Sequence, residues 1–310
     1  MAIPNKMLFV VGAPKCGTTT LVDWLNQNPR ISAASNKEPG YFRSRSTRRW
    51  LDSRKTMPTG NAPHPWRSNL DAYLALFGPL QPDTWALDGS TDYLSDPESA
   101  NLIAQFRGNL PTKIIVMVRD PVDRAFSQYR HLLYSGLEHL SFYDSLLLEE
   151  QRRKEGLQRL FDHTVRSRFA DGIERFATNF GTDLLVLSIV ELRDPEAALK
   201  RVYAFMGEEA HLPTDLKAKN VSVERGVPGL GQRARRATHL LKRSIIGLPA
   251  VPAIRFYHQQ RFGRYDTLDE QAIDYMIEQL GDDMRRCKAN PIIPTDDWWS
   301  LARMEGRVSE

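Results

Sequence analysis

The chain has few cysteines and no long apolar run. Its 310 residues include only Cys16 and Cys287, too few for a disulfide framework, which indicates a reducing compartment. No stretch of about 18 apolar residues is present, and residues 1–6, which precede the first apolar segment, are too short for a signal peptide. We therefore expect a soluble, cytoplasmic protein.

The sequence also lacks the patterns of metal and nucleic-acid binding. No group of His, Cys, Asp or Glu residues has the spacing of metal ligands, so we expect no metal. The formal net charge of +4 suits an anionic ligand, but it is too small to predict a nucleic-acid partner. The length of 310 residues allows one large α/β domain with a substantial core.

The most informative segment is residues 7–20, MLFVVGAPKCGTTT. Residues 7–11 are an apolar run typical of a buried strand in a parallel sheet. Residues 12–17 form a glycine-bounded loop, and Thr18 begins a helix. Backbone N–H groups and the positive end of the helix dipole then point at one place, which predicts an anion site. Lys15 would add a full positive charge, and three consecutive threonines would add hydroxyl donors.

This loop is similar to two kinds of phosphate-binding sequence. Gly12 and Gly17 have the spacing of the nucleotide-binding P-loop, but Thr18 stands where that motif requires lysine. Residues 14–19, PKCGTT, resemble more closely the 5′-phosphosulfate-binding loop of sulfotransferases that use 3′-phosphoadenosine 5′-phosphosulfate (PAPS). The resemblance implies that PAPS is bound by Pro14, Lys15, Cys16, Gly17, Thr18, Thr19 and Thr20.

A second segment, residues 118–129 (VRDPVDRAFSQY), follows the apolar run at 112–118. It resembles the 3′-phosphate-binding segment of the same family, which implies that Arg119 and Ser127 hold the 3′-phosphate of PAPS. A guanidinium suits this role because it can donate two parallel hydrogen bonds to a phosphate. The alternative is an Arg–Asp ion pair that caps the following helix, with Asp120 at the N-cap.

Residues 36–42, NKEPGYF, resemble a segment of heparan sulfate 3-O-sulfotransferases and their bacterial relatives in which the glutamate is the catalytic base. The resemblance implies that Glu38 takes the proton of an acceptor hydroxyl. It also implies that Lys15 stabilises charge on the bridging oxygen as 3′-phosphoadenosine 5′-phosphate (PAP) leaves, with Lys37 assisting either partner. The alternative for Lys37 and Glu38 is a surface ion pair in a turn.

The family fold is a single α/β domain with a central parallel sheet flanked by helices and a P-loop-like strand-loop-helix unit. Further apolar runs predict strands at 31–35, 85–89 and 184–190. Periodicity predicts helices at 70–80, 97–106, 137–160, 169–180, 196–206 and 268–287. Residues 90–94, STDYL, resemble the segment that borders the acceptor pocket, with Thr91-Asp92 in place of Ser/Thr-Pro. Asp88 and Asp92 are the next candidates for the base.

We interpret residues 1–290 as one sulfotransferase domain and residues 291–310 as a C-terminal tail that either packs back or forms an interface. Residues 43–70 resemble a surface insertion, in which Arg43 and the arginines after it are candidates to bind an anionic acceptor. A solvated loop is equally consistent with this composition. The oligomeric state is left open.

A basic segment at 225–265 contains nine lysines or arginines and no acidic residue. It is a candidate lid over PAPS, with Lys219 or Arg225 as the closing residue, or a solvated basic surface. Residues 237–262 are also a candidate for peripheral contact with an anionic membrane.

The hypothesis that explains both phosphate motifs is a PAPS-dependent sulfotransferase, which acts on a hydroxyl of a carbohydrate, lipid or small-molecule acceptor. The alternative, a P-loop kinase or nucleotide hydrolase, requires a lysine at position 18, where this chain has threonine, and a magnesium-binding aspartate, for which only Asp88 is a candidate. A non-enzymatic binder of anionic polymers would explain the basic segment but not the two motifs.

Overall fold

The computed structural model describes residues 4–44, 64–134, 137–138, 140–155, 159–216 and 268–306. Several expectations therefore lie outside the described residues. These are the basic segment 225–265 with its membrane-contact candidate 237–262, the closing residues Lys219 and Arg225, and most of the insertion at 43–70.

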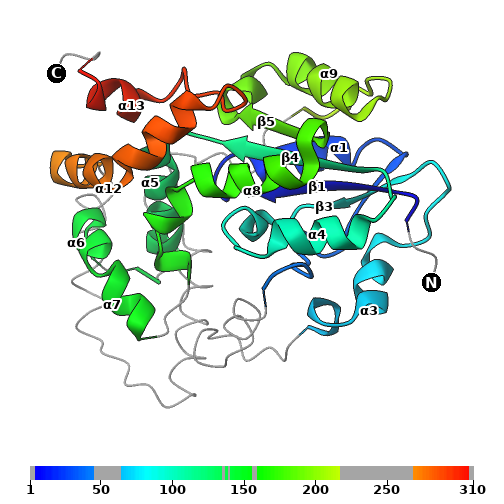
Figure 1. Cartoon of the computed structure of the whole chain (residues 1–310), viewed down its shortest axis with the longest axis horizontal. Coiled ribbons are helices and arrows are strands. Elements are labelled where there is room, and N and C mark those ends of the chain that lie inside the picture. The colour runs from blue at the N-terminus through cyan, green and yellow to red at the C-terminus, as the bar shows by residue number, and fades with distance from the viewer. Residues whose placement is uncertain are drawn as a thin grey trace, which may run out of the picture.

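A five-stranded sheet in the order β2-β3-β1-β4-β5 forms the centre of the described fold, and all four strand pairs are parallel (Figure 1). Its strands are β1 (Lys6–Gly12), β2 (Ile31–Ala33), β3 (Trp85–Asp88), β4 (Thr112–Val118) and β5 (Leu184–Ser188). The central strand β1 is buried on both faces, which explains its unbroken apolar run. The predicted parallel sheet is confirmed.

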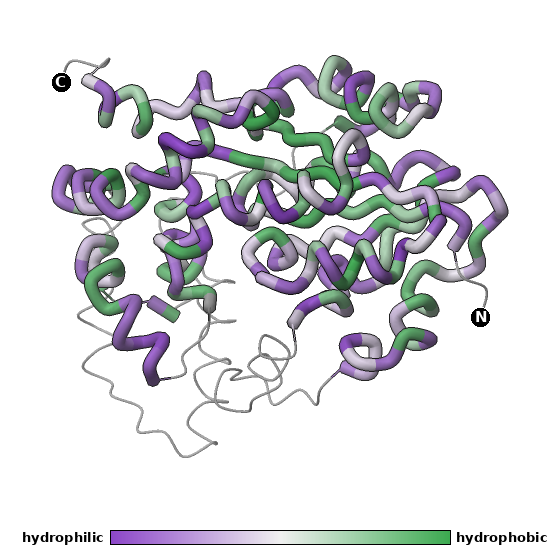
Figure 2. Tube along the Cα trace, in the orientation of Figure 1, coloured by the Kyte–Doolittle hydropathy of each residue, from purple (hydrophilic) through white to green (hydrophobic). Residues whose placement is uncertain are grey.

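Helices cover the sheet and extend beyond it. They are α1 (Thr18–Leu25), α3 (Leu70–Leu74), α4 (Ser99–Arg107), α5 (Pro121–Tyr134), α6 (Phe142–Leu147), α7 (Glu149–Lys154), α8 (Ala170–Phe180), α9 (Pro195–Met206), α12 (Glu270–Ala289) and α13 (Trp299–Met304). Helices α5, α6, α7 and α12 gather beyond the carboxyl end of β4, at the left of Figure 1. Figure 2 shows the hydrophobic residues concentrated on the strands and on the helix faces that meet them. No helix within the described ranges has both the length and the apolar composition to cross a membrane.

Two predicted helices are wrong in extent. The helix predicted at 70–80 ends at Leu74 and continues only as a 3-10 turn, Ala75–Phe77, before Gly78 at φ 69°. The single helix predicted at 137–160 is instead α6 and α7, which meet at Leu148. The chain breaks there because Glu149 turns inward and accepts a hydrogen bond from the backbone N–H of Thr164 at 2.9 Å.

The C-terminal helices attach to the core through two side-chain caps: Asp283 of α12 caps the start of α8, and Asp120 caps the start of α13. Asp283 of α12 accepts hydrogen bonds from the backbone N–H groups of Phe169 (2.8 Å) and Ala170 (3.1 Å) at the start of α8. The backbone N–H of Ser300 in α13 donates to Asp120 Oδ2 at 2.8 Å, at the start of α5. Side-chain acceptors at these positions satisfy N–H groups that have no partner within their own helix. The described part of the tail therefore packs back onto the helix that follows β4.

A glycine-to-alanine pair tests how closely α8 packs against the segment after β3. A Cβ at Gly172 would lie 2.5 Å from the backbone oxygen of Leu94, whereas one at Gly281 would first meet the flexible end of Met304 at 3.2 Å. Gly172→Ala should lower the free energy of unfolding by about 1–3 kcal/mol through overpacking. Gly281→Ala should be neutral or stabilising, because alanine favours a helix by about 1 kcal/mol over glycine. Urea denaturation measures both, and equal effects would contradict this packing.

Candidate active site

The loop between β1 and α1 has the geometry of an anion cradle. Gly17 is the N-cap of α1 with φ 84°, a conformation that glycine adopts without strain. The first N–H groups of α1 have no acceptor within the helix, so they are available to an anion at its N-terminus. The side chains of Thr18 and Thr20 are buried, whereas Pro14, Lys15 and Thr19 are partly exposed.

The thiol of Cys16 is not part of the chemistry of this loop. Its side chain is 0% exposed, and burial raises the pKa of the thiol to about 12. The backbone N–H of Cys16 donates to the carbonyl of Ala13 at 3.3 Å. Cys16 therefore shapes the loop, and its thiol is shielded from solvent.

Lys37 and Glu38 join the loop to the segment after β3. Lys37 Nζ donates to Thr19 Oγ1 at 2.6 Å and lies 3.5 Å from Glu38 Oε1. The hydroxyl of Thr91 donates to the same Glu38 oxygen at 3.3 Å. The Glu38 side chain is 36% exposed, so a ligand can reach its carboxylate. The Lys37–Glu38 ion pair is thus present, but Lys37 also contacts Thr19 of the loop, and Glu38 also contacts Thr91 after β3.

The carboxylate of Glu38 lies beside a second acidic group. Burial and then the negative charge of Asp92 raise the pKa of Glu38, and the positive charges of Lys37, Arg43 and Arg166 oppose this shift. A carboxylate with a raised pKa is a stronger base than an ordinary one, as general-base catalysis requires.

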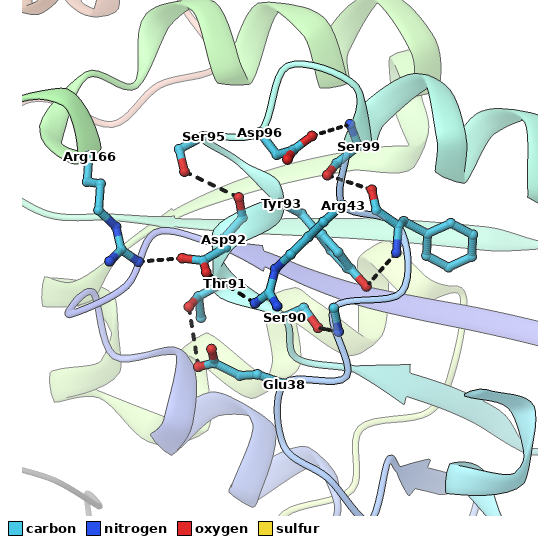
Figure 3. A network of polar contacts seen from close by, with 12 residues as sticks. Glu38, Arg43, Ser90, Thr91, Asp92, Tyr93, Ser95, Asp96, Ser99 and Arg166 are labelled. Carbon is cyan, nitrogen blue, oxygen red and sulfur yellow. Dashed lines mark hydrogen bonds and ion pairs between the residues drawn. The ribbon is translucent and has the colours of Figure 1, made fainter. Parts of the chain in front are cut away.

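Asp92 is the centre of a charged network (Figure 3). Its carboxylate pairs with Arg43 at 3.1 Å and with Arg166, and both arginine side chains are only 4% exposed. The backbone N–H of Gly40 donates to Ser90 Oγ at 2.8 Å in the same region. Arg43, which the sequence suggested as a ligand for an anionic acceptor, is therefore a buried partner of Asp92, and that expectation is wrong.

Asp88 faces the protein interior. Its side chain is 0% exposed and accepts hydrogen bonds from the hydroxyls of Tyr73 and Tyr93, both at 3.0 Å, and from the backbone N–H of Ser90 at 2.9 Å. These contacts leave Asp88 unsuited to act as a base or to hold magnesium. Across the parts of the chain that the structure describes, no group of three His, Cys, Asp or Glu side chains could bind a metal ion.

The second predicted phosphate motif lies at the carboxyl end of β4. Arg119 donates to Asp123 Oδ2 from Nη2 at 2.9 Å and from Nε at 3.3 Å. Ser127 follows on α5 and is 8% exposed. The alternative, an Arg–Asp ion pair, is thus present, but the partner of Arg119 is Asp123. Asp120 instead caps α5 by accepting a hydrogen bond from the backbone N–H of Val122 at 2.9 Å.

The two predicted phosphate motifs follow adjacent parallel strands, β1 and β4. The pKa of Lys15 is lowered by burial and then by the positive charges of Arg124, Lys37 and Arg119. Lys15 follows β1 and Lys37 follows β2, whereas Arg119 and Arg124 follow β4. An anion bound among these groups would relieve their mutual repulsion.

Sequence reasoning missed Arg124 and His131 on α5. Arg124 is 0% exposed, donates to Ser167 Oγ at 2.7 Å and to the carbonyl of His163 at 2.8 Å, and has its pKa lowered by burial to about 9. The pKa of His131 is lowered by burial and by Lys15. Arg124, Ser127 and His131 have the spacing i, i+3, i+7 of one helix face, a signal that the sequence did contain.

The fold agrees with comparisons to known proteins. Residues 8–211 match the model of the sulfotransferase family, and the chain belongs to this family. It is 27% identical over 165 residues to carbohydrate sulfotransferase 15 of mouse (Mus musculus) and to that of human (Homo sapiens). Each match covers 44% of this chain and only 29% of the relative's length. The solved structure of a sulfotransferase from Alicyclobacillus acidocaldarius is 27% identical, with a TM-score of 0.60 over 82% of this chain and 100% of that one.

The proximity of Asp92 to Glu38 predicts a titration shift. Asp92→Asn removes a like charge and releases the positive charges of Arg43 and Arg166, and both changes lower the pKa of Glu38. Carbon-13 NMR titration of the glutamate side chains measures the shift, with thermal unfolding to verify that the variant is folded. Asp123→Asn, which alters the partner of Arg119 instead, is the control. An unchanged or raised Glu38 pKa in Asp92→Asn would contradict the geometry.

Proposed function

We propose that this protein transfers a sulfuryl group from PAPS to a hydroxyl group of an acceptor. The observation that carries the proposal is the position of Lys37, whose Nζ contacts Thr19 of the loop at 2.6 Å and Glu38 at 3.5 Å. A residue predicted to bind the donor and the residue predicted to act as base therefore meet at one place.

In this proposal, the loop at 14–20 binds the 5′-phosphosulfate through its backbone N–H groups, its threonines and Lys15. Arg119 and Ser127 hold the 3′-phosphate. The positive charges that lower the pKa of Lys15 support this assignment, because a multiply charged anion would be attracted to them and would stabilise the ammonium form.

Glu38 accepts the proton of the acceptor hydroxyl as the hydroxyl oxygen forms its bond to sulfur. The bond between sulfur and the bridging phosphate oxygen breaks, and its electron pair leaves with PAP. Lys15 and the N–H groups at the start of α1 stabilise the charge that develops on that bridging oxygen. Thr91 and Lys37 hold the Glu38 carboxylate in place through the contacts already described.

A carbohydrate hydroxyl is the first acceptor class to test, because the curated relatives are named carbohydrate sulfotransferases. Lipid and small-molecule alcohols are the other classes consistent with the proposed chemistry. A cytoplasmic location is also a proposal, supported by the two cysteines, which are free thiols. The kinase alternative is weaker, because Thr18 replaces the motif lysine and Asp88 is turned into the core.

Two substitutions separate the predicted base from the predicted donor ligand. Glu38→Gln keeps the shape of the side chain but cannot take a proton, so turnover should fall by about 10²–10⁴-fold while the affinity for PAP is unchanged. Lys15→Ala should weaken both PAP binding and turnover, because its charge acts on the ground state and the transition state. The measurements are calorimetry with PAP and transfer of labelled sulfate from PAPS to a panel of carbohydrates, lipids and alcohols.

Glu278→Gln, the same change at an exposed position of α12, is the matched control and should behave as wild type. Near-normal turnover by Glu38→Gln would remove the base assignment. Absence of sulfate transfer to every acceptor class, in a protein that binds PAPS, would contradict the choice of a hydroxyl acceptor.

A further inference from the structure

The C-terminal helix α13 contacts the N-terminal end of α5, which lies two residues after Arg119. The indole N–H of Trp299 donates to Asp123 Oδ1 at 3.2 Å, and the backbone N–H of the next residue, Ser300, donates to Asp120 Oδ2 at 2.8 Å. Two consecutive residues near the end of the described chain thus bind two acidic residues at the start of α5, Asp120 just before the helix and Asp123 in its first turn. This tail is the part of the sequence to which the proposed function gives no role.

Asp123 is shared between Trp299 and Arg119. One carboxylate oxygen accepts from the indole, and the other accepts from Arg119 Nη2 at 2.9 Å and Nε at 3.3 Å. The Asp123 and Arg119 side chains are 35% and 26% exposed. An ion pair this close to solvent is weakly held on its own, so a third partner on the other oxygen restricts the orientation of the carboxylate and of the guanidinium bound to it.

Trp299 is itself held in place by its neighbours. Trp298, Ser300 and Leu301 are at most 1% exposed, and Trp298 packs against Phe169 with ring centroids 5.8 Å apart. The indole N–H therefore comes from a fixed part of the fold. By donating to the Asp123 carboxylate, this N–H also partly offsets its negative charge, which would otherwise repel a phosphate bound by Arg119.

We propose that Trp299 is a positioning residue that acts through Asp123 to orient Arg119 toward the 3′-phosphate of the donor. The tail would then determine how strongly the protein prefers PAP and PAPS to nucleotides that lack a 3′-phosphate. This inference rests on the proposed function, because it requires Arg119 to bind that phosphate.

The test compares two ligands that differ only in the 3′-phosphate, PAP and adenosine 5′-monophosphate, by calorimetry. Trp299→Phe keeps the aromatic ring and removes the N–H donor, so the Kd for PAP should rise about three- to tenfold while the Kd for the monophosphate stays the same. Trp298→Phe is the matched control, because the indole nitrogen of Trp298 has no hydrogen-bond partner among the described residues. It should leave the ratio of the two Kd values unchanged.

A double-mutant cycle shows whether Trp299 acts through Arg119. In an Arg119→Ala background, Trp299→Phe should have no further effect on PAP binding. In the wild-type protein, the indole proton resonance of Trp299, assigned by its loss in Trp299→Phe, should shift with PAP and not with the monophosphate.

An unchanged ratio of Kd values in Trp299→Phe, or equal weakening of both ligands, would overturn the inference, since a structural role affects both ligands alike. Failure of the wild-type protein to bind PAP would overturn the proposed function and this inference with it. A raised Kd for PAP with an unchanged Kd for the monophosphate in Trp299→Phe, with PAP bound by the wild type, supports both.

Discussion

Burial of positive charge around Lys15 is the constraint on which the site depends. Burial and the charges of Arg124, Lys37 and Arg119 lower the pKa of Lys15, and burial lowers that of Arg124 to about 9. Such an arrangement is unfavourable unless the fold holds the groups in place or an anion neutralises them. The fold does so through adjacent parallel strands: β1 leads into the loop of Lys15, and its neighbour β4 leads directly into Arg119, just before α5.

A chain of contacts connects this positive region to the acidic groups of the site. Arg124 of α5 binds Ser167 and the carbonyl of His163. Arg166, in the same turn, pairs with Asp92, and Asp92 raises the pKa of Glu38. The helix predicted to bind the donor and the carboxylate predicted to activate the acceptor are therefore positioned by one segment, residues 162–168. Positive groups therefore lie around the predicted donor loop, and paired charges lie around the partly exposed carboxylate of Glu38.

The sequence predicts the parts of this arrangement that are local. The apolar runs at 7–11 and 112–118 are strands because both faces of a central parallel strand are buried, and each leads directly into a phosphate motif. Helices with a clear apolar face, such as α8, were also predicted within a residue of their observed bounds. The positions of the loop and of Arg119 in the site follow from the order of these units.

Contacts between distant segments were not predictable. The pairing of Asp92 with Arg43 and Arg166 joins three separate segments, and it makes Arg43 structural although its sequence context suggested a ligand. The bond from Trp299 to Asp123 likewise depends on how α13 packs onto α5. Even the break between α6 and α7 depends on a long-range contact, because the Glu149 carboxylate turns inward to Thr164.

The measurement that tests the central claim most directly is calorimetric titration of the wild-type protein and Arg119→Ala with PAP and with ATP plus magnesium. The account predicts that PAP binds the wild type without added metal and more tightly than ATP with magnesium. It also predicts that Arg119→Ala weakens PAP binding by roughly ten- to a hundredfold, the effect of losing one charge-assisted contact of about 1.5–3 kcal/mol. Tighter binding of ATP with magnesium, or unchanged PAP affinity in Arg119→Ala, would contradict it.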